Sequence, residues 1–285
     1  MVIVGIFVPN EKNEGGKQRM KGVIIYFSNT GNTKLACERI KGKSRNIDFE
    51  LFNMRDGYPD LDCYGFVGFA TYASEFKVAK FVSDYMKSLP EVHNKLAFVF
   101  TTYGRDNGSS GMVLAGLASK KGFRVVAEHA LNTPENYPPV IRMEHGHVDN
   151  PTTEQVAAFD AFIDELSGIA LKLKNGENLP ECRITAKLIH AVIRNLTNRW
   201  MMQKMMGDKK VNTDLCIKCG KCVGTCPYGA VAMKEYPTFD ESKCYGCFAC
   251  YNCCPKKAIY TKKFNQFANY PRPLPEVVKK LSIEK

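Results

Sequence analysis

The feature that most constrains this chain is a cysteine pattern that occurs twice near its C-terminal end. Nine of its twelve cysteines fall between Cys216 and Cys254. The first copy has the spacing C-x2-C-x2-C-x3-C-P and consists of Cys216, Cys219, Cys222 and Cys226, followed by Pro227. The second copy has the same spacing if its members are Cys244, Cys247, Cys250 and Cys254, followed by Pro255. In a chain without a secretory signal, such clustering indicates metal ligation rather than disulfides.

Three thiolates spaced in this way, with a fourth before a proline, are typical of [4Fe–4S] clusters, and the fourth cysteine binds the other cluster. Three thiolates wrap around one corner of a cubane through a tight turn, so only a distant residue reaches its fourth iron. We therefore assign cluster 1 to Cys216, Cys219, Cys222 and Cys254. We assign cluster 2 to Cys226, Cys244, Cys247 and Cys250. Zinc is the alternative, but paired zinc sites have two CxxC halves separated by a longer loop.

The second copy contains one surplus cysteine, Cys253. Both the x3 spacing and the following proline favour Cys254 as the ligand. Cys253 is therefore predicted to be a small buried thiol, with a redox role or alternative ligation as the other interpretation.

The N-terminal part alternates short apolar runs with helical patterns. The runs that predict strands are 23–28, 47–53, 64–70, 96–102 and 123–130. Helical periodicity follows the first run to about Ile40, occupies 76–89 and 111–121, and returns at 154–174. Continuous apolar strands that alternate with helices predict an α/β domain with a parallel sheet covered on both faces.

The loop SNTGNT follows the first predicted strand and opens the first helix. Its residues are Ser28, Asn29, Thr30, Gly31, Asn32 and Thr33. Hydroxyls and free amides at a helix N-terminus favour phosphate binding, whereas GxxxxGK[ST] and GxGxxG are absent. The loop therefore predicts a cradle for a monophosphate, and an ordinary capped helix start is the alternative.

The loops after the third and fourth predicted strands carry aromatic and hydroxyl side chains. They contain Thr71, Tyr72, Thr101, Thr102, Tyr103, Gly104, Asn107 and Gly108. In a doubly wound sheet, ligands bind outside the carboxyl ends of the strands. Tyr72 and Tyr103 are therefore predicted to flank a flat ring.

At this point a resemblance can be named. Residues 21–172 resemble a flavodoxin, residues 211–265 resemble a bacterial two-cluster ferredoxin, and the whole resembles the fused EFR-type ferredoxins. The resemblance implies a flavodoxin-like five-stranded sheet of order 2-1-3-4-5 and a small α+β domain with two [4Fe–4S] clusters. It implies FMN, with its phosphate on residues 28–33 and its isoalloxazine between the loops around Tyr72 and Tyr103. Ala73 and Ser74 stand where flavodoxins often have a glycine, which departs from the pattern.

The chain divides into five segments by composition. They are an N-terminal extension (1–20), a flavodoxin-like domain (21–174), a linker with an amphipathic helix (175–210), the ferredoxin domain (211–268) and a C-terminal tail (269–285). Residues 1–19 are interpreted as an over-extended gene start or a disordered tail. The amphipathic helix of the linker has its apolar stripe at Ile184, Leu188, Val192, Leu196 and Trp200. We expect the stripe to pack on the protein's own core, with a membrane surface as the alternative, and the charged tail to be weakly structured.

The formal net charge of +11 favours an acidic redox partner protein, with contact at an anionic membrane surface as the alternative. No nucleic-acid-binding signature is present, and the lack of a signal or a long apolar run predicts a cytoplasmic protein. We expect an electron-transfer protein that connects one- and two-electron partners. One alternative is a flavin-dependent reductase of a small substrate, with a pocket at Tyr72, Tyr103 or the loop 137–147. The other is a binding module with an empty flavodoxin-like fold.

Overall fold

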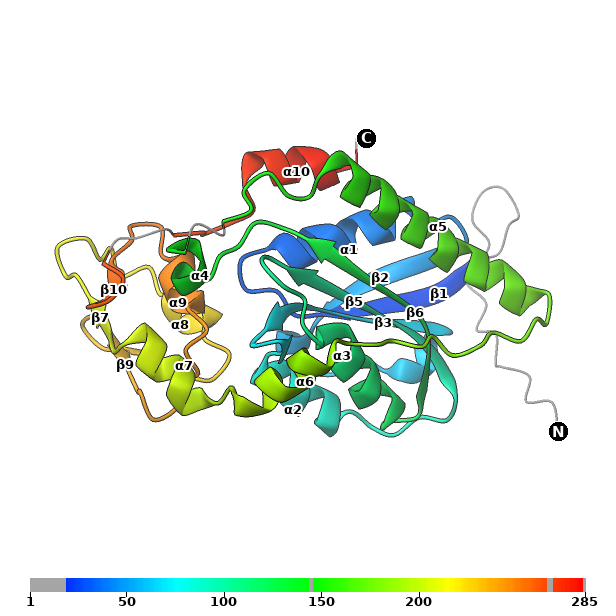
Figure 1. Ribbon diagram of the computed structural model, residues 1–285, viewed down its shortest axis with the longest axis horizontal. Helices are drawn as coiled ribbons and strands as arrows, with labels where there is room; N and C mark the ends of the chain where they lie inside the picture. The colour runs from blue at the N-terminus through cyan, green and yellow to red at the C-terminus, as the bar shows by residue number, and fades with distance from the viewer. Residues whose placement is uncertain (1–18, 144–145, 266–268, 284–285) are drawn as a thin grey trace.

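The computed structural model describes residues 19–143, 146–265 and 269–283. Residues 1–18, which make up nearly all of the predicted N-terminal extension, lie outside the described residues. The described chain forms a sheet covered by helices and, at one end of it, a smaller cysteine-rich region (Figure 1).

Five parallel strands form the sheet in the order β2-β1-β3-β5-β6. They are β1 (Met20–Tyr26), β2 (Ile47–Asn53), β3 (Phe66–Ser74), β5 (Lys95–Tyr103) and β6 (Phe123–Asn132). Counted along the chain this is 2-1-3-4-5, the flavodoxin-like order, so the predicted fold class is confirmed. An additional two-residue strand, β4 (Lys77–Val78), pairs antiparallel to β3 and was not predicted.

Helices cover both faces of the sheet (Figure 1). One face is covered by α1 (Asn32–Lys43) and α5 (Thr153–Lys174), and the other by α2 (Lys80–Ser88) and α3 (Ser110–Ser119). Because successive side chains of a strand point to opposite faces, Ile24 packs in the core under α1 and α5, and Ile25 packs in the core under α2 and α3. Both residues are fully buried, as expected for a sheet with two covered faces.

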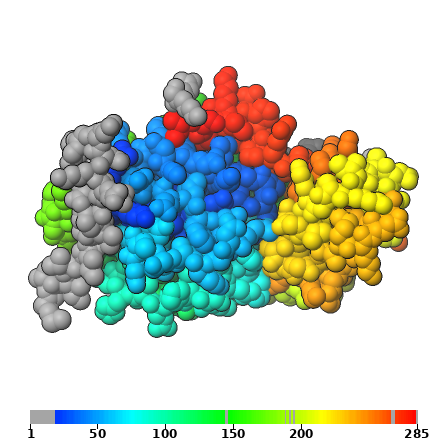
Figure 2. Space-filling model, turned by 180° about the vertical axis from the view of Figure 1, so that it is seen from behind, coloured from blue at the N-terminus to red at the C-terminus, as the bar shows by residue number. Residues whose placement is uncertain are grey.

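The cysteine-rich region combines short helices with two small antiparallel pairs. Its elements are β7 (Lys209–Val211), α8 (Lys221–Thr225), β8 (Val231–Met233), β9 (Pro237–Phe239), α9 (Ala249–Cys253) and β10 (Ile259–Thr261). Strand β7 pairs with β10, and β8 pairs with β9. The region adjoins the sheet domain closely, as the space-filling view also shows (Figure 2). It lies at the end of the sheet where the loop after β1 and the loop after β6 are found.

The predicted linker helix is two helices, α6 (Leu188–Leu196) and α7 (Arg199–Met206). They are separated at Asn198, whose side chain accepts a hydrogen bond from the Met201 amide and caps α7. Ile184 of the predicted stripe packs against the core under α2 and α3. Val192, Leu196 and Trp200 are 51%, 66% and 65% exposed, so the expectation that the stripe packs on the core is wrong for these three. The basic residues between them allowed both interpretations, and tertiary contacts decide which face is covered. No helix among the described residues has both the length and the apolar character needed to span a membrane.

The expectation of a weakly structured C-terminal tail is also wrong. The tail forms α10 (Pro275–Leu281), which packs beside α1 (Figure 1). Val277 and Leu281 are fully buried in the core that α1 and α5 cover. Arg39 of α1 donates a hydrogen bond of 3.1 Å to the Leu281 carbonyl oxygen. A short helix, α4 (Pro138–Ile141), lies in the Pro-rich loop after β6.

Candidate cofactor sites

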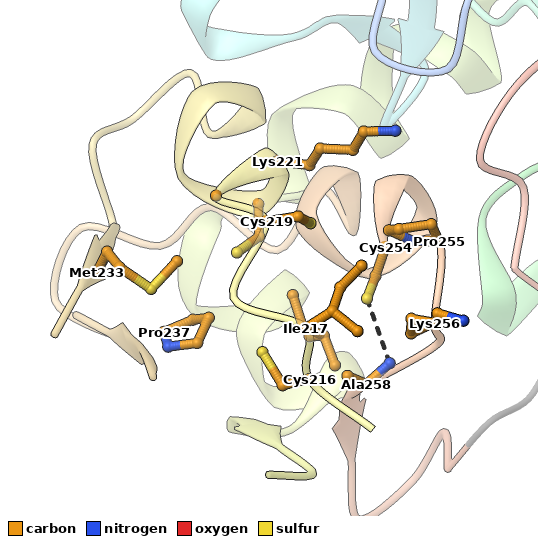
Figure 3. Close-up of a pocket in the computed structure, with 13 residues that line it drawn as sticks. Cys216, Ile217, Cys219, Lys221, Met233, Pro237, Cys254, Pro255, Lys256 and Ala258 are labelled. Atoms are coloured by element: carbon orange, nitrogen blue, oxygen red, sulfur yellow. Dashed lines mark hydrogen bonds between the residues drawn. The ribbon is translucent and has the colours of Figure 1, made fainter. Parts of the chain in front are cut away.

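The cysteines predicted to bind cluster 1 come together around one cavity. Its lining includes Cys216, Cys219, Cys222 and Cys254, and Figure 3 shows several of these side chains with Ile217, Met233 and Pro237 around the same space. Cys254 comes from the other copy of the repeat, more than thirty residues from Cys222, and it caps the C-terminus of α9. The crossed arrangement predicted from the spacing is therefore what the fold brings together here, and cluster ligation itself stays a prediction.

The second set of cysteines surrounds a separate cavity. Cys226, Cys244, Cys247 and Cys250 line it, and Cys226 caps the C-terminus of α8. The two copies place their amides alike: Ala230 N donates to Cys226 Sγ over 3.3 Å, and Ala258 N donates to Cys254 Sγ over 3.2 Å. Amides aimed at ligand sulfurs are what an iron–sulfur cluster requires of its surroundings.

The spacing of the thiols differs from that of a single-ion site. In the part of the chain that the structure describes, no three His, Cys, Asp or Glu side chains are grouped so as to hold one metal ion. Each set of four thiols instead surrounds an apolar space lined by residues such as Ile217 and Phe248. This arrangement fits a cubane, with iron at four corners, better than a zinc ion at one point.

Cys253 is the surplus thiol, and it is not among the described residues that line either cavity. Its Sγ donates to the Cys250 carbonyl oxygen over 3.4 Å. Burial raises the pKa of the Cys253 thiol to about 11.

A buried lysine lies against the second cysteine cavity. Lys209 Nζ donates a 2.8 Å hydrogen bond to Cys244 Sγ, and its side chain is only 4% exposed. Glu241 Oε2 lies 3.7 Å from the same ammonium. Nothing in the cysteine spacing indicated this residue, because its position in β7 is set by the pairing of that strand with β10.

The predicted flavin site is a hollow between the loops of the sheet and α9. It combines the SNTGNT loop (residues 28–33), which we call the phosphate loop, with the loops after β3 and β5. The predicted residues that line it are Ser28, Asn29, Thr30, Asn32, Thr33, Tyr72, Thr102, Tyr103 and Gly104. Inside this wall Asn29 Nδ2 donates to Tyr72 Oη over 2.6 Å, and the hydroxyls of Thr33 and Thr102 are 2.8 Å apart.

The phosphate loop leaves polar groups available at the start of α1. Gly31 precedes the helix with a φ of 104°, a conformation that favours glycine, and no side chain caps the first amides. Asn32 is 4% exposed, and its Nδ2 has no hydrogen-bond partner among the described residues. An orphaned buried donor beside uncapped helix amides matches the needs of a phosphate group. The residues of this loop therefore fit FMN.

The other five predicted flavin-site residues do not line the hollow. Gly31 lies under Pro273, because a Cβ at residue 31 would be 2.7 Å from Pro273 Cδ. Gly108 lies similarly against Phe76. Thr101 Oγ1 donates to Asn107 Oδ1 over 2.9 Å, which holds the loop after β5. Thr71 is fully buried, and its hydroxyl has no partner in the described chain. These residues support the loops rather than form the surface of the hollow.

Sequence reasoning missed a fourth loop and one helix of the site. Thr133, Pro134, Glu135 and Asn136, which follow β6, line the hollow, together with Cys247, Ala249 and Asn252 of the cysteine-rich region. The loop after β6 could have been found because it ends a parallel strand at the same sheet edge. The contribution of α9 could not, because it depends on how the two regions pack.

Two polar side chains join the cysteine-rich region to the walls of the hollow. Arg55 donates to the Thr225 carbonyl oxygen over 2.7 Å and to Asn29 Oδ1 over 3.2 Å, so it connects the residue before Cys226 with the phosphate loop. Asn252, 2% exposed, donates through Nδ2 to the Asn136 carbonyl oxygen over 2.7 Å. Both contacts fix α8 and α9 against the sheet domain.

The loop between β3 and β4 is held in a tight hairpin. Ala73 and Ser74 pair with Val78 and Lys77, and the turn residue Glu75 has a φ of 57°. The backbone at Ala73, which lines the hollow, therefore belongs to a paired strand instead of a free glycine loop. This explains structurally the departure from the flavodoxin pattern seen in the sequence.

Comparisons with known proteins give one family match and several similar solved structures. Residues 215–259 match the family of 4Fe-4S dicluster domains. No curated protein matches the chain. Among solved structures, a flavodoxin from the domain Archaea is 21% identical, with 54% of this chain and 99% of that chain covered and a TM-score of 0.38. Flavodoxin 1 from Bacillus cereus is 18% identical, with 55% and 99% covered and a TM-score of 0.37.

A third solved structure is also similar to part of the chain. The rubredoxin oxygen:oxidoreductase from Desulfovibrio gigas is 17% identical, with 54% of this chain and 37% of that chain covered and a TM-score of 0.40. The fold assignment rests on the strand order β2-β1-β3-β5-β6. The chain thus carries a 4Fe-4S dicluster domain beside a flavodoxin-like domain.

Proposed function

We propose that this protein transfers electrons between two [4Fe–4S] clusters and an FMN held in the hollow at the sheet edge, as in the EFR-type fusions that its sequence resembles. The observation that carries the proposal is a shared wall. Cys247 and Ala249 line both the second cysteine cavity and the flavin hollow. A cluster ligand therefore forms part of the flavin site, so no intervening domain separates the two cofactor positions.

Each part of the chain has a defined role in this proposal. The eight cysteines hold the clusters, which exchange single electrons, whereas bound flavin supplies chemistry of one or two electrons. Asn32 and the first amides of α1 bind the phosphate, and Tyr72 and Tyr103 line the ring position. Arg55 and Asn252 keep the two cofactor sites at a fixed separation. No side chain has to act as an acid or base in the transfer.

The test is an anaerobic purification followed by cofactor analysis and a dithionite titration. About eight irons and one FMN per chain are expected, with flavin absorbance bleached by electrons that pass through the clusters. Cys247→Ser, which changes the shared wall, should slow flavin reduction by a protein donor, whereas Cys63→Ser, at an exposed thiol outside the sites, should not. Zinc in place of iron, or a chain without flavin, would exclude the proposal. Turnover of a small substrate would instead favour the reductase.

A further inference from the structure

The two cysteine cavities share a repeated backbone but differ in the charges that lie against their thiols. The hydrogen bond from the Ala230 amide to Cys226 Sγ in the first copy is equivalent to that from the Ala258 amide to Cys254 Sγ in the second. Lys209 breaks this equivalence, because its ammonium donates to Cys244 Sγ over 2.8 Å. The counterpart of Cys244 in the first copy is Cys216, and no lysine among the described residues that line its cavity is buried.

The lysines at the two cavities differ in how deeply they are buried as well as in how they contact the thiols. Lys221 and Lys256 line the first cavity, but both are exposed, so water and salt screen their charges. The side chain of Lys209 is 4% exposed, where the effective dielectric constant is lower and screening is weak. The Arg199 guanidinium adds to this charge, because Nε donates to the Cys244 carbonyl oxygen over 2.9 Å. Glu241, with its carboxylate 3.7 Å from Nζ and 33% exposed, offsets only part of it.

This asymmetry has a redox consequence once clusters are bound. Taking up one electron makes a cluster and its thiolates more negative by one charge. A buried ammonium hydrogen-bonded to a ligand sulfur stabilises that reduced state and raises the reduction potential. We propose that Lys209 makes cluster 2 the higher-potential cluster, so that electrons arriving at cluster 1 move on to cluster 2, beside the flavin hollow. The inference rests on the proposed function, and it gives the transfer a direction.

The surface of the molecule agrees with that direction. Among the eight predicted ligands Cys219 is the exposed one, whereas Cys250 is buried and Cys247 forms the wall of the flavin hollow. A one-electron donor protein can therefore approach cluster 1 from solvent, and each electron that it gives up passes inward. The donor is oxidised by one electron for each electron that cluster 1 takes up, and flavin is the final acceptor within the chain.

The test is a potentiometric titration of the holoprotein, followed by EPR, with iron and FMN counted on the same sample. The native protein should show two unequal one-electron potentials. Lys209→Met removes the charge and approximately keeps the length of the side chain. It should lower the higher of the two reduction potentials by ~59 mV, which is a tenfold change in the equilibrium constant of a one-electron reduction. Lys210→Met is the matched control, because it removes the same charge from the exposed neighbour in β7 and should leave both potentials in place.

A second variant keeps the test decisive if Lys209→Met fails to assemble. Glu241→Gln keeps an oxygen that can accept from the Lys209 amide but removes the negative charge, so it should raise the same potential. Two equal potentials in the native protein, or a shift confined to the lower one, would overturn the inference while leaving the proposed function intact. Absence of clusters or FMN from the native sample would overturn both.

Discussion

The sheet domain and the cysteine-rich region are stabilised in different ways. Most of the largest side chains under 2% exposed, among them Phe49, Phe98 and Phe159, belong to the sheet domain, whereas Phe248 belongs to the cysteine-rich region. The sheet therefore buries an apolar core on each face. The cysteine-rich region buries few apolar groups, and its core includes Cys222 and Cys250 themselves. A region this small usually requires metal to fold, so its structure should depend on the clusters and that of the sheet should not.

The largest effect is expected from removing a single predicted cluster ligand. Cys254→Ala should lose cluster 1, about half of the iron, because this thiol lines the first cavity opposite Cys216 and Cys219. Cys253→Ala is the adjacent control and should retain both clusters, because Cys253 donates to a carbonyl instead. Iron analysis and EPR of the two variants measure the difference. Iron loss from Cys253→Ala with full iron in Cys254→Ala would reverse the assignment.

The converse experiment weakens the sheet alone. Phe98 is fully buried and packs against Phe49, Phe66 and Phe162. Phe98→Ala should reduce the free energy of unfolding of the sheet domain by about 3–5 kcal/mol, through lost burial and a cavity. Far-UV circular dichroism during denaturant unfolding measures this change, and iron content in native buffer should stay at the native level. A loss of iron in native buffer would mean that the two regions fold as one unit.

The sequence predicted those features that have local causes. Each parallel strand is a continuous apolar run because both of its faces are buried, so the five strands of the sheet could be recognised without tertiary information. The cysteine spacing likewise predicted which thiols would meet, because the reach of a short helix is fixed by geometry. Both predictions use contacts between residues that are close in the chain or repeated within it.

The features that sequence reasoning missed depend on distant contacts. Helix α10 has only two fully buried residues, Val277 and Leu281. They are buried because they pack into the core that α1 and α5 cover, which the local sequence of α10 does not reveal. Val192 and Trp200 belong to an apolar stripe with the correct period, yet they are exposed. Periodicity reports which side chains share a face, but it does not report whether another element covers that face.

A smaller effect is expected from pH, through a histidine of the sheet domain. Burial lowers the pKa of His129 to about 4, and the imidazole stacks on Phe100, Phe159 and Phe162. The unfolded chain takes up a proton near pH 6.5, whereas folded His129 does not until about pH 4. Stability from this residue is therefore complete above pH 6.5 and falls as the pH drops toward 4, by at most about 1.4 kcal/mol per pH unit.

The measurement is the free energy of unfolding of the sheet domain at several values between pH 7 and pH 4.5. His129→Leu should remove part of the acid-dependent slope, and His93→Gln, at an exposed histidine, is the matched control. An unchanged slope in His129→Leu would show that other groups cause the acid dependence. This experiment sharpens the comparison because His129 belongs to β6 of the sheet domain and lies against the rings of Phe100, Phe159 and Phe162.

The smallest effect concerns the segment that joins the two regions, residues 269–281, which we call the C-terminal strap. Asn269 donates to the Tyr251 carbonyl oxygen over 2.8 Å, on the side of the cysteine-rich region. Tyr270 Oη donates to Asn32 Oδ1 over 3.0 Å, on the side of the phosphate loop. The strap therefore holds the Asn32 amide while its Nδ2 remains without a partner among the described residues.

Tyr270→Phe should consequently weaken FMN binding without unfolding either region. A single hydrogen bond of this kind contributes about 1 kcal/mol, which corresponds to roughly a fivefold increase in the FMN dissociation constant. Fluorescence titration of FMN-depleted protein measures the constant, and Tyr260→Phe, in β10, is the control for loss of a phenol hydroxyl elsewhere. The two regions differ in what stabilises them. Through Asn269 and Tyr270, however, the strap connects the cysteine-rich region with Asn32, a residue of the predicted phosphate site in the sheet domain. An unchanged constant in Tyr270→Phe would show that the phosphate loop is organised by the sheet alone, and the strap would then serve only to dock α10.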